Sequence, residues 1–155
     1  MAYNIRYNVT HIQQMSPMLC WSAAVSMMLG SNFTAGPGGA SLDAQGGLRA
    51  SFDNVQALAR SYGLTVAPPA SWTVDQIAGY MSRGPIVMLG IMPRRHAIVI
   101  SGLVGDGSPR TLAYVNDPFR PTGPQSYPYD GLMTGAAFNL PAGTPWTPSE
   151  YILYR

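Results

Sequence analysis

The first strong hydrophobic pattern in the chain is an uncharged run that lies between Ser16 and Gly30. Alanine, methionine, leucine and valine dominate this run, which predicts a helix that is buried on most of its sides. Ser16 is suited to cap the N-terminus of that helix, and Pro17 is suited to its first position. Gly30 is suited to the position just after the last turn. We therefore expect a buried helix between these residues.

Two further segments have the spacing of amphipathic helices. The first covers residues 54–62 and ends at Gly63, and its inward face is expected to consist of Val55, Leu58, Ala59 and Tyr62. The second opens at Thr73, because Thr73 and Gln76 have the spacing of a capping box. Its inward residues are expected to be Ile77, Tyr80 and Met81. Gly84-Pro85 then predicts the end of that helix.

After Gly84 the pattern changes to short runs that are rich in β-branched residues and are separated by Gly, Pro and Asp. Strands are expected at residues 85–92, 96–104, 111–116 and 150–154. Residues 118–148 are rich in Pro, Gly and aromatic residues, so we expect mostly irregular structure there, with one strand near 133–138. Helices followed by an antiparallel sheet predict an α+β fold. The chain has no internal repeats, and we expect one domain over residues 1–155.

The composition excludes several chemistries. All nine cationic residues are arginines, which excludes a phosphate-loop lysine, a kinase lysine and a Schiff base. One cysteine excludes an intrachain disulfide framework and a cysteine-rich zinc site. Only His11 and His96 remain as imidazole ligands. We therefore expect no cofactor and no metal.

Charge and hydropathy restrict the partners. The formal net charge is +2, and no arginine cluster is larger than Arg94-Arg95, which disfavours nucleic-acid binding. The longest apolar run, residues 86–92, is too short to span a membrane. The N-terminus lacks the apolar core of a signal peptide. We expect a protein without nucleic-acid or membrane partners and without Sec-dependent export.

Cys20 is the main candidate for chemistry. It lies in the first turn of the predicted buried helix, where aligned peptide dipoles and free N–H groups stabilise a thiolate. A lone cysteine in an apolar helix is more often a buried structural residue, so the assignment depends on what else the chain supplies.

Three other residues favour the catalytic interpretation. Gln14 lies six residues before Cys20, and its amide is suited to donate a hydrogen bond to a developing oxyanion. His96 begins one predicted strand and Asp117 ends the next. If these strands pair as a hairpin through residues 105–109, Asp117 lies near His96 and orients its imidazole.

These motifs resemble those of a known family. Gln14, Cys20-Trp21 at a helix start, His96-Ala97-Ile98-Val99 followed by Gly102, and Asn116-Asp117-Pro118 occur in the order found in papain-like cysteine peptidases. The resemblance is closest to the compact bacterial branch, which includes peptidases that process bacteriocin leaders and secreted effector proteases of plant pathogens. It covers roughly residues 10–120.

The resemblance implies a papain-like fold, with the nucleophile helix packed on a small antiparallel sheet. It implies that Cys20 is the nucleophile and that His96 is the general base and acid. Asp117 would orient His96, while Gln14 and the Cys20 backbone N–H would form the oxyanion hole. Plant papains have Asn as the third residue, and Asn116 is adjacent. Neighbouring strand residues point to opposite faces, so only one of the two can serve; we expect Asp117, because Asp-Pro matches the bacterial branch.

The function expected from these residues is that of a cysteine protease, which forms and hydrolyses an acyl-enzyme. By resemblance it would be the toxin or effector domain of a secreted bacterial protein, delivered by a non-Sec route into the cytoplasm of a target cell. Its partners would be a protein or peptide substrate and an inhibitor or immunity protein.

The sequence is also compatible with other functions. The same residues fit an amidase, deamidase or transglutaminase that acts on peptidoglycan or protein side chains, or a processing peptidase inside its own cell. A binding module with a dead site is disfavoured, because all four catalytic positions are filled. His11 has no visible partner and is expected to be an ordinary surface or core histidine. Arg94-Arg95 is expected to be a solvated turn, and the aromatic stretch 118–146 is a candidate wall of the substrate groove.

Overall fold

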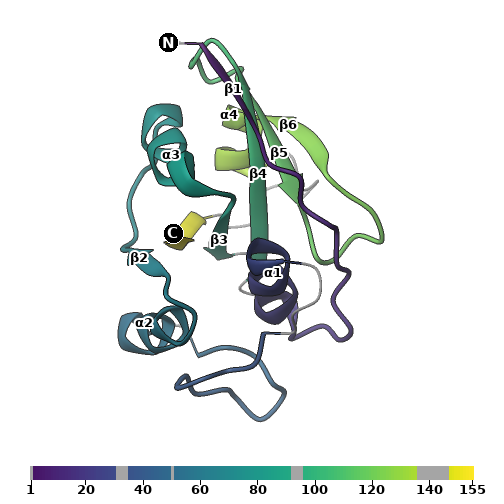
Figure 1. Cartoon of the computed structure of the whole chain (residues 1–155), viewed down its shortest axis with the longest axis vertical. Helices are drawn as coiled ribbons and strands as arrows, with labels where there is room; N and C mark the ends of the chain where they lie inside the picture. Colours follow the sequence, from purple (N-terminus) through teal and green to yellow (C-terminus); the bar gives the residue numbers. More distant parts are fainter. Residues whose placement is uncertain (1, 31–34, 50, 92–95, 136–146) are drawn as a thin grey trace.

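The computed structural model describes residues 2–30, 35–49, 51–91, 96–135 and 147–155. Its elements follow one another in this order: β1 (Tyr3–Arg6), α1 (Cys20–Leu29), α2 (Phe52–Ser61), β2 (Thr65–Ala67), α3 (Val74–Tyr80), a 3-10 turn (Met81–Arg83), β3 (Ile86–Ile91), β4 (Ala97–Gly105), β5 (Leu112–Asn116), β6 (Gln125–Pro128), α4 (Tyr129–Thr134) and β7 (Thr147–Tyr154). Helices are packed against an antiparallel sheet (Figure 1), so the α+β prediction is confirmed.

The strands of the described residues form one sheet in the order β2-β7-β3-β4-β5-β6, and β1 pairs with β4. The β4–β5 hairpin is the one that the sequence predicts, with Val99 opposite Asn116. On its other edge, β4 pairs with β3 along its first half and with β1 along its second. β4 is therefore the central strand, and the residues at its start are held from both sides.

Both faces of the sheet are covered. Alternate residues of β4 belong to different cores: Val99 packs with α1 and α2, whereas Ile98 and Ile100 pack with α3 and α4. A strand that is buried on both faces has apolar residues at nearly every position. This is why residues 97–103 of β4 are buried without alternation.

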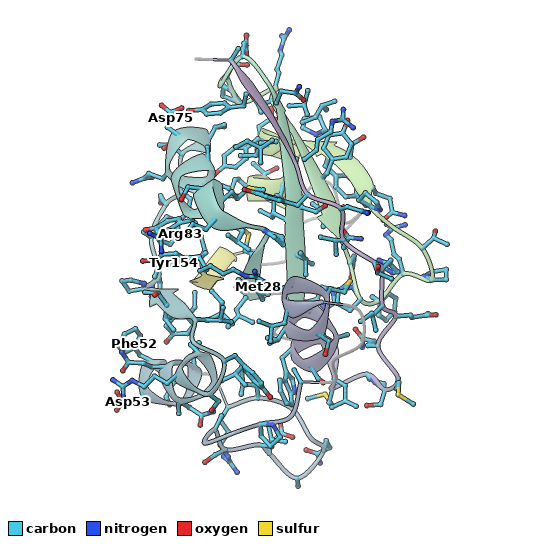
Figure 2. All side chains as sticks on the ribbon, in the orientation of Figure 1. Met28, Phe52, Asp53, Asp75, Arg83 and Tyr154 are labelled. Carbon is cyan, nitrogen blue, oxygen red and sulfur yellow. The ribbon has the colours of Figure 1, made fainter. Side chains whose placement is uncertain are left out.

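The buried helix α1 lies against β4 and β3, at the lower end of β4 as drawn in Figure 1. All residues from Cys20 to Met28 are buried, as the uncharged sequence predicts. Arg155 donates a hydrogen bond to the Met28 carbonyl near the C-terminal end of the helix (2.8 Å). Figure 2 shows Met28 on the ribbon at this place.

The predicted start of α1 is wrong by three residues. The helix begins at Cys20, with Leu19 as the N-cap, and not at Pro17 with Ser16 as the cap. The Leu19 N–H donates to the Ser16 carbonyl (3.2 Å), so Ser16 and Pro17 belong to a separate turn before the helix. Gly30 is the C-cap itself and has a φ of 132°, which favours glycine.

Helices α2 and α3 form where the sequence predicts them, but α2 begins two residues earlier than predicted, at Phe52, and ends at Ser61. Ser51 caps α2, and Val55, Leu58 and Ala59 are buried. The Thr73–Gln76 capping box is present, and Ile77 and Met81 are fully buried. Tyr62 and Tyr80 are only half-buried. Figure 2 shows Phe52 and Asp53 on the outer edge of α2, and Asp75 at the upper end of α3.

Several short elements are absent from the sequence prediction. The strands β1, β2 and β6 are three or four residues long, and their patterns are too brief to have a readable period. Met133 and Thr134 lie in α4 and not in a strand; residues 136–138 of the strand expected there lie outside the described residues. β1 depends on Gly102 of β4, because a Cβ there would lie 2.7 Å from the Ile5 carbonyl oxygen.

Candidate active site

Cys20 is the first residue of α1. Backbone N–H groups in the first turn of a helix have no partner within the helix, and the intrahelical bonds begin where the Ala23 N–H donates to the Leu19 carbonyl (3.1 Å). The N-cap residue, Leu19, has no polar side-chain atom and forms no side-chain cap. The Cys20 sulfur therefore lies at the positive end of the helix dipole, where negative charge is stabilised.

His96 and Asp117 are joined by a hydrogen bond between Nε2 of the ring and Oδ1 of the carboxylate, at 2.5 Å. His96 immediately precedes β4 and Asp117 immediately follows β5, and the register of this hairpin brings the two strand ends together. The side chains are 17% and 6% exposed, respectively. The pair is therefore largely shielded from water, which strengthens its electrostatic interaction.

The same imidazole also interacts with Cys20 through a side-chain hydrogen bond. Because Nε2 faces the carboxylate, Nδ1 is the ring nitrogen that is left for the sulfur. The structure thus brings Cys20, His96 and Asp117 together from α1, β4 and β5. In sequence the first and the last of them are 97 residues apart.

The pKa of His96 is raised from 6.5 to about 9. Burial has the largest single effect and lowers this pKa, but the hydrogen bonds and charges of Asp117 and Cys20 together outweigh it. His96 is therefore an imidazolium at neutral pH, held between a carboxylate and a sulfur. A cation in that position stabilises a thiolate.

Asp117 is held by contacts on several sides. Burial on its own would raise the pKa of its carboxyl group, but the hydrogen bond and charge of His96, the backbone N–H of Phe119 and the charge of Arg120 lower the pKa below its usual value. The Phe119 N–H donates to Oδ1 at 2.9 Å. The carboxylate therefore stays ionised and has a fixed orientation toward His96.

Asn116 points elsewhere. Its Nδ2 lies 3.3 Å from Nδ1 of His11, and the side chain is fully buried. The structure thus places Asp117, and not Asn116, against His96, and the two side chains point in different directions, as successive residues of a strand do. His11 is half-buried and bonded at both ring nitrogens. Its partners were not visible in the sequence, because they lie more than 100 positions away.

Gln14 lies beside the turn that follows Asp117, since its backbone N–H donates to the Pro118 carbonyl at 2.8 Å. Its side-chain Nε2 donates to the Ser16 carbonyl at 2.9 Å, which fixes the direction of the amide. An amide nitrogen carries two hydrogens, and the bond to Ser16 uses one of them. The amide is thus oriented by a short local contact just before α1.

A family model described as the papain-like cysteine protease AvrRpt2 matches residues 1–126. The chain belongs to this family. It is a papain-like cysteine peptidase, hence a hydrolase, and its substrate is a protein or peptide. A comparison with curated proteins gives no match. The matched range contains Gln14, Cys20, His96 and Asp117.

The described tryptophans of the peptidase are buried packing residues, and they lie in different cores. Trp21 is 3% exposed, and its indole N–H donates to the Gly46 carbonyl at 3.0 Å, which joins the segment between α1 and α2 to α1. Trp72 is also buried, whereas Trp146 and Arg94-Arg95 lie outside the described residues. Within the described residues, no group of three or more His, Cys, Asp or Glu side chains is arranged to hold a metal ion. None of the helices in that part of the chain is long and apolar enough to span a bilayer.

The raised pKa of His96 predicts the pH at which the activity of the peptidase falls on the alkaline side, which is called the alkaline limb of kcat/KM. The imidazolium persists up to about pH 9, so kcat/KM is expected to fall as pH rises through about 9. Asp117→Asn removes the carboxylate charge that raises this pKa, so the alkaline limb should move to lower pH. The measurement is kcat/KM as a function of pH, from about pH 5 to about pH 10. Asp53→Asn removes an exposed carboxylate in the first turn of α2 and should leave the limb in place; an unmoved limb in Asp117→Asn would contradict the prediction.

Proposed function

We propose that the peptidase uses Cys20 as its nucleophile, His96 as general base and acid, and Asp117 as the residue that orients His96. The observation that carries the proposal is the continuous set of contacts from the start of α1 through the imidazole to the buried carboxylate. Gln14 and the Cys20 backbone N–H are proposed as the oxyanion hole.

In the acylation step, the thiolate of Cys20 attacks the carbonyl carbon of the scissile peptide bond. The carbonyl oxygen becomes an oxyanion, which the Gln14 amide and the Cys20 N–H stabilise by hydrogen bonds. The His96 imidazolium then gives its Nδ1 proton to the leaving nitrogen, and the C–N bond breaks. An amine product leaves, and a thioester to Cys20 with a neutral His96 remains.

In the deacylation step, a water molecule attacks the thioester and the neutral His96 takes one of its protons. The second tetrahedral intermediate expels the thiolate, and the carboxylic acid product leaves. The site returns to a thiolate beside an imidazolium. Throughout, Asp117 holds the ring through Nε2, so that Nδ1 keeps facing the sulfur.

We further propose that the peptidase is the toxin or effector domain of a secreted bacterial protein, delivered by a non-Sec route and active in the cytoplasm of a target cell. The membership in a family described by the protease AvrRpt2 and the sequence resemblance to secreted effector proteases support this role. A specific inhibitor or immunity protein that covers the Cys20 site is proposed as a second partner.

Expression inside a target cell tests the effector role. The active form should produce new protein N-termini, found by mass spectrometry, that are missing from cells that express Cys20→Ala. In the native bacterium, the protein should reach the medium when Sec export is blocked. An inhibitor protein should stop alkylation of Cys20 by iodoacetamide. Identical termini with both forms would contradict the role in the target cell, and retention under Sec blockade would contradict the route.

A further inference from the structure

Two segments that carry proposed catalytic groups lie side by side. One, here called the leading segment, consists of residues 11–14 and contains Gln14. The other, here called the Asp117 turn, consists of residues 117–120. The leading segment belongs to no helix or strand, so its position depends on tertiary contacts and not on a backbone ladder of its own.

Two hydrogen bonds join these segments, one at each end. The backbone N–H of Gln14 donates to the Pro118 carbonyl at 2.8 Å. Nε2 of His11 donates to the Arg120 carbonyl at 2.7 Å. The Arg120 N–H in turn donates to the Asp117 carbonyl at 3.0 Å, so the residue that His11 holds is part of the turn that sets the carboxylate. The His11 bond is the only one of these that a side chain supplies.

The contacts of His11 also define which of its ring nitrogens carries the proton. A carbonyl oxygen accepts only, so Nε2 carries a hydrogen, and the Asn116 amide donates to Nδ1 at 3.3 Å. Both contacts suit the tautomer in which Nε2 donates and Nδ1 accepts. Asn116 is 0% exposed, and its Oδ1 has no partner among the described residues. Within that part of the chain, the bond to His11 is thus the one contact that orients this buried amide, next to Asp117.

Gly123 packs closely against the imidazole of His11. A Cβ at this position would lie 2.6 Å from Nδ1 of His11 and 3.1 Å from Nδ2 of Asn116. Only a glycine allows the backbone to approach so closely without displacing the ring. His11 is therefore enclosed by Asn116, Gly123 and Arg120, and it is not a mobile surface side chain.

We propose that His11 is a positioning residue. It keeps the proposed oxyanion donor Gln14 and Asp117, which orients His96, in a fixed position relative to each other. The inference rests on the proposed function. Its physical reason is that both groups must stay within a fraction of an ångström of their working geometry, because a displacement of about 1 Å can cost about 100-fold in rate. Without the side-chain bond, the leading segment and the Asp117 turn are joined by one backbone hydrogen bond only.

Substitutions at His11 separate its two contacts. Glutamine can place its amide nitrogen where Nε2 of His11 lies, and so keeps the bond to the Arg120 carbonyl. Asparagine reaches only the position of Nδ1, and so keeps the contact with Asn116. Alanine keeps neither. If the bond between the two segments is decisive, His11→Gln retains activity, while His11→Asn and His11→Ala lose it.

The experiment measures kcat, KM and the alkaline limb of kcat/KM for the three variants on an unfolded protein substrate such as casein. The assay temperature lies below the melting temperature of every variant. We expect kcat to fall about 10- to 100-fold in His11→Ala and His11→Asn with little change in KM. The alkaline limb should move below its value of about pH 9 in the parent, because a displaced Asp117 turn weakens the interaction of Asp117 with His96. His11→Gln should remain within about threefold of the parent, which is small against that loss.

A merely structural role predicts a different result. In that case the melting temperature falls, but kcat and the alkaline limb of the folded fraction do not move, and this outcome would overturn the proposal. Equal activity of His11→Gln and His11→Asn would overturn it as well. If His11→Ala does not fold, Gly123→Ala provides a second test, because it displaces the ring without removing it. That variant should show the same loss of kcat, and an unchanged kcat with a displaced ring would refute the proposal.

A failure of the proposed function can be distinguished from a failure of the His11 proposal. If the parent does not cleave the protein substrate and Cys20 is no more reactive than an ordinary thiol, the catalytic assignment fails. If the parent is active and all His11 variants match it, only the positioning role fails. The rate of Cys20 alkylation against pH gives the same comparison without a substrate, since it also depends on the imidazolium of His96.

Discussion

Replacing Cys20 with alanine is expected to abolish peptide-bond cleavage. Loss of the nucleophile in a well-studied hydrolase triad costs about 10⁶-fold in kcat, because the remaining groups can only bind and polarise the substrate. The chain has a single cysteine, so no second thiol can substitute. The measurement is the release of new termini from a protein substrate, with Cys20→Ser as a variant of nearly the same volume. Both variants should keep the circular dichroism spectrum of the parent, and measurable activity in either would contradict the assignment.

The same residue should also react rapidly with iodoacetamide in mildly acidic buffer. The positive end of α1 and the His96 imidazolium both stabilise the thiolate, although Cys20 is only 7% exposed. The chain unfolded in guanidinium is the matched control, since it contains the same thiol without these neighbours. The rate of alkylation, followed by mass spectrometry near pH 6, should be higher for the folded chain. A folded rate that is equal to or below the unfolded rate, and that depends on pH in the same way, would show that the thiol is not activated.

Replacing Gln14 with alanine is expected to lower kcat by roughly 100- to 1,000-fold, the usual cost of removing one oxyanion-hole donor. The fold should be retained, because the hydrogen bond from Gln14 to Pro118 uses the backbone N–H, which alanine also has. The buried Gln14 Oε1 has no partner among the described residues, so its removal also relieves an unpaired polar atom. KM should change little, since the donor acts mainly on the transition state.

The neighbouring residue provides the control for this variant. Gln13 is exposed, and Gln13→Ala should leave kcat, KM and the melting temperature unchanged. A collapse of the melting temperature in Gln14→Ala, with kcat retained in the folded fraction, would make Gln14 a structural residue.

The helices and the central hairpin could be predicted because their signals are local. The capping box at Thr73, the buried face of α2 and the uncharged run of α1 each depend on residues that are close together along the chain. The start of α1 could not be placed in the same way. Ser16 and Pro17 have the residue types of a helix start, but they form a separate turn, and the helix then begins at Cys20 without a side-chain cap. A position where the usual cap is missing is typical of a functional site.

The sequence by itself determined the residue types, their order and the strand ends at which His96 and Asp117 lie, because a hairpin between two adjacent apolar runs is a short-range feature. Only the tertiary structure decided which of Asn116 and Asp117 faces His96. It also decided that the Cys20 sulfur meets the same ring, and that His11 joins Arg120 across 109 positions. These contacts depend on how α1, the leading segment and the β4–β5 hairpin pack together. No local pattern encodes such packing, since it follows from burying all their apolar faces at once.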